Sequence, residues 1–194
     1  LVYFSFWYMA LYHWNWARRK FKPDNRPTPG RMLHNITYTL LGAIQMAMWE
    51  VVFMHMWATG KLPYISDAAL LASPLALAWT AFLVIAIPVF RDFHFYFAHR
   101  FLHLRFFYKF VHSLHHRNTD IEPFSGMCMH PVEHLYYFSS VLPSIYLPCS
   151  PLIFLWGALH LTLSPAASHS GWEDHWQGDL FHYLHHSKFE CNYG

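Results

Sequence analysis

Charged residues and cysteines are both scarce in this sequence. Lys, Arg, Asp and Glu make up 12% of its 194 residues, whereas an average globular domain contains roughly 25%. The three cysteines form no Cys-x-x-Cys pair, which argues against a disulfide framework and against a cysteine-type zinc site. Hydrophobic residues, in contrast, make up 55% of the chain. This composition is unusual for a soluble protein and indicates long apolar segments.

Several familiar metal- and cofactor-binding motifs are also absent. The chain has no Glu-x-x-His, the pair through which soluble carboxylate-bridged di-iron proteins hold iron on bundle helices. It has no His-Glu-x-x-His of the zinc hydrolases, no nucleotide-binding motif and no cytochrome b5-like haem domain. A metal site in this chain therefore needs other ligands, and histidine, which occurs 17 times, is the abundant one.

Three apolar stretches are candidates for membrane spans, which need about 20 mostly apolar residues. Residues 69–90 carry no charge, residues 35–57 are interrupted by Glu50 and His55, and residues 135–164 are broken by prolines. We expect Glu50 and His55 to face the bundle interior or the membrane interface. The stretch 135–164 is too long for one crossing at about 1.5 Å per residue, so we expect a hairpin that enters the membrane and returns. The sequence predicts an all-α integral-membrane bundle without strands.

The distribution of basic residues suggests a topology. Six of the 13 lie in one short window: Arg18, Arg19, Lys20, Lys22, Arg26 and Arg31. Between apolar runs such a cluster is typical of a cytosolic juxtamembrane loop, and we favour this interpretation over nucleic-acid binding. We expect membrane helices and this loop in residues 1–90, and a second, histidine-rich domain with a cytosolic helical cap in residues 91–194. The chain begins at Leu1 and stops after Asn-Tyr-Gly, so we expect it to be part of a longer protein.

Three groups of closely spaced histidines follow the apolar stretches. They are His99-Arg-Phe-Leu-His103, His112-Ser-Leu-His115-His116 and His182-Tyr-Leu-His185-His186. Residues four apart lie on one face of a helix, so each group can direct two imidazoles at one metal, and the adjacent pairs can serve two ions. One such pair alone is usually structural. Eight imidazoles are twice what a closed tetrahedral zinc site needs, so three groups favour two ions with open coordination positions.

In these motifs the chain resembles the fatty acid hydroxylase and sterol desaturase superfamily of membrane-bound non-haem diiron enzymes, and most closely its sterol-desaturase-like branch. The resemblance covers roughly residues 90–194 and includes His130-Pro-Val-Glu-His134, His169-Ser-Gly171 and Asn192-Tyr-Gly194. It implies two irons bound by the eight motif histidines, with one further ligand; the full set is His99, His103, His112, His115, His116, His169, His182, His185 and His186.

The roles of five neighbouring residues are less defined by this resemblance. His130 and His134 are either further ligands or residues that position the start of the hairpin. Asp92, Glu133 and Asp179 are candidates to accept the second N–H of a ligating imidazole, as carboxylates around metal sites do. Each of these three is equally compatible with an ordinary surface carboxylate.

The resemblance implies an O2-dependent enzyme that hydroxylates or desaturates a lipid, either a sterol or a fatty-acyl or sphingolipid chain. Electrons would come from a separate donor such as cytochrome b5 or a ferredoxin, with the metal site on the cytosolic side of the endoplasmic reticulum in a eukaryote or of the inner membrane in a bacterium. Two other classes stay open, a zinc hydrolase and a metal transporter. The histidines lie past the ends of the spans, whereas transporters place ligands near the bilayer midplane.

Overall fold

The computed structural model describes residues 1–194 except positions 15, 17–19, 23–26 and 174–177. In the described residues the regular elements are all helices, and the one β-bridge is an isolated pair, Lys20 with Trp172. The prediction of an all-α protein is confirmed. The basic residues Arg18, Arg19 and Arg26 lie outside the described residues.

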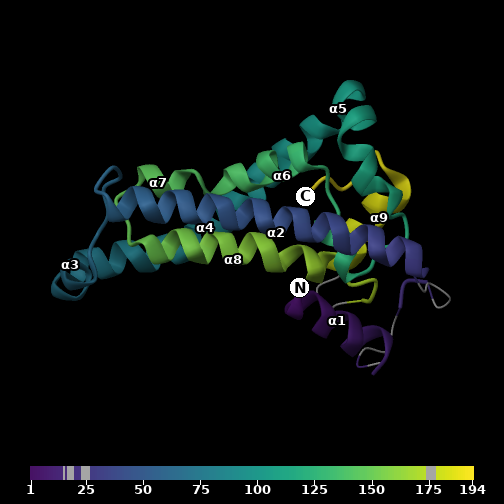
Figure 1. The fold of residues 1–194 in the computed structure, drawn as a ribbon, viewed down its shortest axis with the longest axis horizontal. Helices are drawn as coiled ribbons and strands as arrows, with labels where there is room; N and C mark the ends of the chain where they lie inside the picture. Colours follow the sequence, from purple (N-terminus) through teal and green to yellow (C-terminus); the bar gives the residue numbers. More distant parts are fainter. Residues whose placement is uncertain (15, 17–19, 23–26, 174–177) are drawn as a thin grey trace.

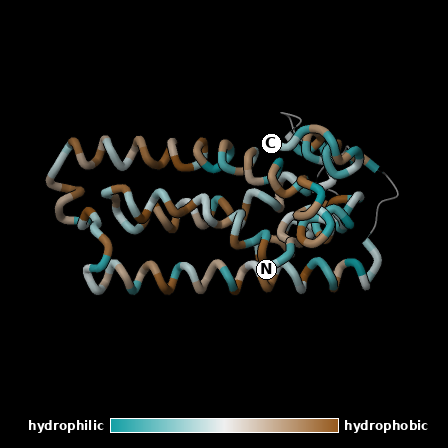
Figure 2. Tube along the Cα trace, turned by 90° about the horizontal axis from the view of Figure 1, so that it is seen from above, coloured by the Kyte–Doolittle hydropathy of each residue, from teal (hydrophilic) through white to brown (hydrophobic). Residues whose placement is uncertain are grey.

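Three long helices form the body of the molecule (Figure 1): α2 (Pro29–Ala58), α4 (Pro74–Leu102) and α8 (Pro151–Ser168). Helix α8 packs against both α2 and α4. Each of the three is long and apolar enough to cross a membrane, and hydrophobic residues recur along their length (Figure 2). Large apolar side chains such as Leu75 and Ile85 are mostly exposed. Exposed apolar surface of this extent suits lipid rather than water, which indicates an integral membrane protein.

The helix that contains most of the predicted span 69–90 begins and ends at other residues than predicted. A short helix α3 (Asp67–Ala72) comes first, and α4 begins only at Pro74, because proline fits the first turn of a helix, where its missing N–H is not needed. Ser73 caps α4 by accepting a hydrogen bond from the Ala76 N–H over 3.3 Å. At its other end α4 continues to Leu102. The first histidine pair therefore ends the same helix that carries the span.

Residues 131–168 run away from the histidine-rich end and come back. The outward arm consists of α6 (Pro131–Phe138), η3 (Ser139–Val141) and α7 (Pro143–Tyr146), and α8 is the return arm (Figure 1). Each of the three α-helices begins with a proline in its first turn. Two of the three prolines within 135–164, Pro143 and Pro151, thus mark helix starts. Entry of this stretch into the membrane as a hairpin stays a prediction.

Two further prolines lie inside the long helices and help to join them. Pro88 cannot donate to the Val84 carbonyl one turn earlier, and that oxygen accepts the indole N–H of Trp156 on α8 over 3.0 Å. Pro165 likewise frees a carbonyl of α8, which accepts the Tyr137 hydroxyl of α6 over 3.2 Å. Since an unpaired carbonyl is costly in an apolar environment, each of these aromatic donors ties two helices together.

At the histidine-rich end, short elements fill the space beside the long helices. These are α1 (Val2–Tyr12), α5 (Arg105–Phe110), η1 (His112–Arg117), η2 (Pro123–Met127) and α9 (Gly178–Lys188). All five residues of η2 are buried, and η2 contacts α1, α2 and α8. A Cβ on Gly126 would lie 2.2 Å from the Pro165 carbonyl oxygen. Glycine is therefore what allows η2 to approach the backbone of α8 so closely.

Replacing Gly126 with alanine is expected to force η2 away from α8 and to lower the free energy of unfolding by about 1–3 kcal/mol, the usual cost of overpacking. The measurement is the thermal unfolding temperature of the detergent-solubilised protein. Gly30→Ala is the matched control, because a Cβ at Gly30 would meet no atom within 4 Å. Equal changes of the unfolding temperature in the two variants would contradict the close contact between η2 and α8.

Candidate metal centre

The nine histidines predicted as ligands converge at one end of the bundle. They come from the end of α4, from η1, from the residue that follows α8, and from α9. They form two groups in which one ring nitrogen per residue lies within 4.8 Å of the others. The first group is His99, His103, His112, His116 and His185, and the second group is His115, His169, His182 and His186.

The division between the groups follows the spacing in the sequence. The adjacent residues His115 and His116 belong to different groups, and so do His185 and His186. His112 and His116, four apart in η1, belong to the same group, and so do His182 and His186, four apart in α9. The geometry expected from the His-x-x-His-His pattern is therefore present, with the adjacent pair directed at two centres.

Ring nitrogens within each group face one another at short distances. The Nε2 atoms of His103, His116 and His185 lie 3.1–3.2 Å apart in the first group. In the second group the Nε2 atoms of His169 and His182 lie 2.9 Å apart. Converging lone pairs of this kind are what a metal ion between the rings requires.

Other ring nitrogens in the two groups are buried without a hydrogen-bond partner among the described residues. They are Nε2 of His99, Nε2 of His112, Nδ1 of His116 and both nitrogens of His186. Leaving a buried polar atom unsatisfied costs about 1–3 kcal/mol. Several such atoms around two points are explained by metal ligation, so the residues present fit a two-metal site.

Backbone carbonyls set the tautomer of several rings. Nδ1 of His99 lies 2.8 Å from the Tyr193 oxygen, and Nδ1 of His115 lies 3.1 Å from the Cys128 oxygen. Nδ1 of His185 faces the Cys191 oxygen in the same way. Because a carbonyl oxygen can only accept, Nδ1 must carry the proton in each case, and the Nε2 lone pair then faces into the group. Such outer contacts commonly orient metal-binding histidines.

Burial keeps these imidazoles neutral. Loss of solvent lowers the pKa of His115 and His185 to about 4, and that of His103 and His112 to about 3. Desolvation disfavours the charged imidazolium, and nearby rings add to the effect for His103, His115 and His185. Since the neutral ring is the form that binds metal, the two groups are ready to ligate across the physiological pH range.

The three predicted carboxylates have different partners. A Glu133 oxygen lies 2.7 Å from Nδ1 of His112, and burial raises the pKa of Glu133 to about 8. Asp179 accepts a hydrogen bond from Ser170, the residue after His169. Asp92 instead forms an ion pair with Arg91, and its side chain is 66% exposed. Of the three, Glu133 thus has the contact expected of a residue that orients a ligand.

His130 and His134 lie outside both groups. His130 is the N-cap of α6, where its Nδ1 accepts a hydrogen bond from the Val132 N–H over 3.2 Å. His134 is buried, and its Nε2 lies 3.1 Å from the Met127 carbonyl. These contacts position the start of α6.

A buried network that sequence reasoning missed holds His169. The Ser125 hydroxyl lies 2.9 Å from Nδ1 of His169 and donates to the Glu122 carbonyl over 2.7 Å. With its proton used there, the hydroxyl accepts from Nδ1, which leaves Nε2 of His169 free to face His182. The Glu122 carboxylate accepts from Asn35 over 2.6 Å and from the Phe124 N–H. The reciprocal capping of Glu122 and Ser125 is a local signal that could have revealed this network.

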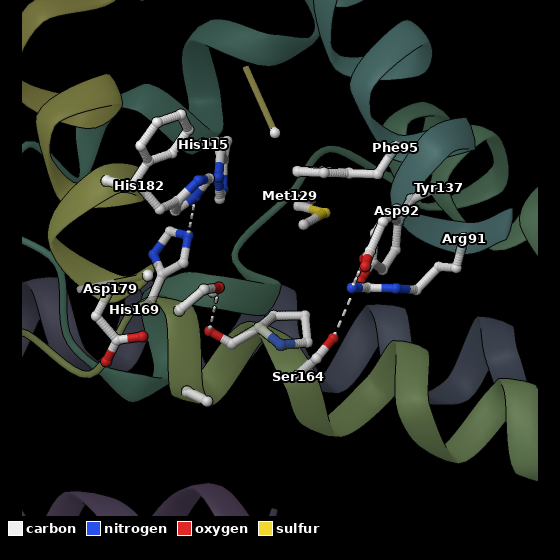
Figure 3. A pocket seen from close by; sticks show the side chains of 17 residues that line it. Arg91, Asp92, Phe95, His115, Met129, Tyr137, Ser164, His169, Asp179 and His182 are labelled. Carbon is white, nitrogen blue, oxygen red and sulfur yellow. Dashed lines mark hydrogen bonds and ion pairs between the residues drawn. The ribbon is translucent and has the colours of Figure 1, made fainter. Parts of the chain in front are cut away.

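The second histidine group adjoins a cavity of about 540 Å³. Its walls include His115, His169 and His182 at one end and the apolar side chains of Phe95 and Met129 (Figure 3). This volume is within the range of small-molecule sites, roughly 300–1,000 Å³. A ligand in the cavity would therefore lie next to the second group.

These features define an all-helical membrane protein with two adjoining histidine groups able to bind metal. Residues 83–194, more than half of the chain, match the fatty acid hydroxylase family. The chain belongs to the fatty acid hydroxylase family, and the predicted resemblance is confirmed.

Curated relatives are lipid enzymes by name. A Delta(7)-sterol 5(6)-desaturase of Gibberella zeae is 33% identical over 55% of this chain and 32% of its own. Methylsterol monooxygenase 1 of Danio rerio is 31% identical over 55% of this chain and 40% of its own, and a very-long-chain aldehyde decarbonylase of Oryza sativa is 32% identical over 56% and 45%. The chain thus spans less than half the length of these three relatives. No solved structure matches the chain significantly.

Replacing Ser125 with alanine is expected to weaken binding of one of two metal ions by about 10–100-fold, as losses of outer hydrogen bonds to ligands do, because His169 loses its orienting partner. Competition with a chelator measures both affinities. Ser144→Ala is the control: that buried hydroxyl donates to the Val141 carbonyl in the η3–α7 region, and both affinities should stay unchanged. Equal affinities in wild type and Ser125→Ala would contradict the orienting role.

Proposed function

We propose that this chain is the catalytic part of a membrane-bound diiron oxidoreductase that uses O2 to hydroxylate or desaturate a lipid. The observation that carries the proposal is the pair of buried histidine groups beside a cavity. Sterol, methylsterol and long-chain aldehyde enzymes among the relatives support a lipid of the sterol or long-chain class.

The donor set favours two irons over one zinc. A closed structural zinc site takes four ligands, whereas nine imidazoles in groups of five and four are present here. Imidazole suits iron as well as zinc and copper, and the carboxylates of soluble di-iron proteins are replaced by histidine. When bound, the irons would supply the activation of O2 and the removal of hydrogen from an unactivated C–H bond.

In this scheme the residues of the chain orient the histidine rings, exclude water and bind the lipid. Backbone carbonyls at Tyr193, Cys128 and Cys191 fix the direction of three rings. Burial of the histidines excludes bulk water, which protects a reactive site from side reactions. The cavity beside His115, His169 and His182 would hold the lipid, which reaches it from the membrane around the long helices.

The cytosolic placement of the metal site is part of the proposal. Lys22 of the basic window pairs with Asp120, which follows η1, and Lys20 lies over the rings of Tyr12 and Trp172. These contacts place part of the basic window at the histidine-rich end, and basic loops are usually cytosolic. A separate electron donor such as cytochrome b5 or a ferredoxin would then dock on that side, at the endoplasmic reticulum or the bacterial inner membrane.

His186→Ala should abolish at least about 99% of O2-dependent lipid oxidation, because both ring nitrogens of His186 are without a hydrogen-bond partner in the described structure and loss of a ligand disables the metal site. The assay supplies the full-length, iron-loaded protein in membranes with an electron donor and a panel of sterols and long-chain aldehydes. Mass spectrometry then quantifies the products.

His130→Ala is the matched control and should keep most of the activity, since His130 caps α6 and lies outside both groups. Full activity of His186→Ala would contradict the assignment of His186 as a ligand. An iron-loaded wild type that oxidises no lipid in the panel would contradict the proposed function.

A further inference from the structure

The cavity beside the second histidine group has a polar end away from the histidines (Figure 3). There Arg91 of α4 donates a hydrogen bond to the Ser164 hydroxyl of α8 over 2.9 Å and forms an ion pair with Asp92. Phe95 and Met129 are drawn between this end and the histidines. The cavity thus combines an apolar middle with two chemically distinct ends.

Helix geometry fixes how far apart the two ends are. Ser164 precedes His169 by five positions, about 8 Å along α8. A ligand that reaches both ends therefore has its polar group on the order of 10 Å from the carbon next to the histidines.

The charges at the polar end favour an uncharged ligand group. Arg91 is balanced by Asp92, so an anionic head group would be attracted by one and repelled by the other. A hydroxyl can accept from Arg91 or Ser164 and donate its own proton to the Asp92 carboxylate. Arg91 is largely buried, with a side chain 17% exposed, and its Nε has no hydrogen-bond partner among the described residues. The site therefore has both donors and an acceptor to offer.

We infer that Arg91, Asp92 and Ser164 bind the free hydroxyl of a neutral lipid alcohol and select such substrates over fatty-acid anions. This inference rests on the proposed function, because it takes the cavity as the substrate site. The three residues act by positioning: they hold the polar group while the carbon to be oxidised lies beside the histidines.

Binding of matched ligands tests this selectivity without turnover. The full-length, iron-loaded protein is kept under argon in nanodiscs, and the probes are a fluorescent sterol with a free hydroxyl, its O-methyl ether and a fluorescent long-chain fatty acid. Wild type should bind the alcohol about 10-fold more tightly than the ether, as expected for a hydrogen bond with a charged partner. Ser164→Ala should weaken binding of the alcohol about 3–10-fold, and binding of the ether should fall as well, because the ether oxygen can also accept from Ser164.

A change of charge gives a second, independent outcome. Asp92→Asn leaves Arg91 unbalanced, so affinity for the fatty-acid anion should rise about 2–5-fold, in the range of a partly exposed charge interaction, while affinity for the alcohol falls. Thr162→Val is the control, because this hydroxyl of α8 donates to the Ala158 carbonyl of its own helix, and the alcohol-to-ether ratio should match that of wild type.

Two results would overturn the inference: a wild type that binds alcohol and ether equally, or a Ser164→Ala variant with unchanged affinity for the alcohol together with an Asp92→Asn variant with unchanged preferences. Arg91 would then be only an anchor at the membrane surface. These results leave the proposed function intact if the enzyme still oxidises lipids. Selective binding of the alcohol without any O2-dependent product would instead support the polar end and reject the proposed function.

Discussion

Nine neutral imidazoles, eight of them buried, at one end of a helical bundle impose the main constraint on this structure. A buried ring nitrogen needs a partner, and the protein supplies one for the outer nitrogen of most rings: a backbone carbonyl, the Glu133 carboxylate or the Ser125 hydroxyl. Among the described residues, the inner nitrogens then face one another or have no hydrogen-bond partner. Two metal ions would resolve this arrangement, since each would accept the lone pairs that otherwise repel.

The rest of the fold brings these histidines together and orients their rings. Helix α4 carries the first histidine pair directly from the apolar bundle, and the out-and-back path of residues 131–168 brings the later histidines to the same end. Prolines start the helices along this path, and the two internal ones leave carbonyls that Trp156 and Tyr137 satisfy. Helix η2 packs closely on α8 through Gly126 and so places Ser125 against His169. Packing of the bundle and orientation of the ligands are therefore coupled.

Spacing along the sequence was enough to predict that eight of the nine histidines gather and that adjacent ones diverge, because helical periodicity is local. His169 was expected only from the resemblance to the family. Spacing could not predict the contacts made across the fold. Asp92 was a candidate to accept an N–H from a ligating imidazole. It precedes His99 by seven positions, about 10 Å along the helix axis, and it pairs with Arg91 instead. Ser125 was missed because its partner His169 is 44 positions away. The break at Ser73 and the extension of α4 to Leu102 also depend on capping and on tertiary contacts rather than on hydropathy.

Mössbauer spectroscopy together with metal analysis tests the central claim most directly. The full-length, detergent-solubilised protein is loaded with ferrous iron under anaerobic conditions and then exposed to O2. The two histidine groups predict about two irons per chain, in line with imidazole-rich iron ligation, and a magnetically coupled diferric signal after oxidation. One tightly bound zinc per chain, with no uptake of iron and no reaction with O2, would contradict the account.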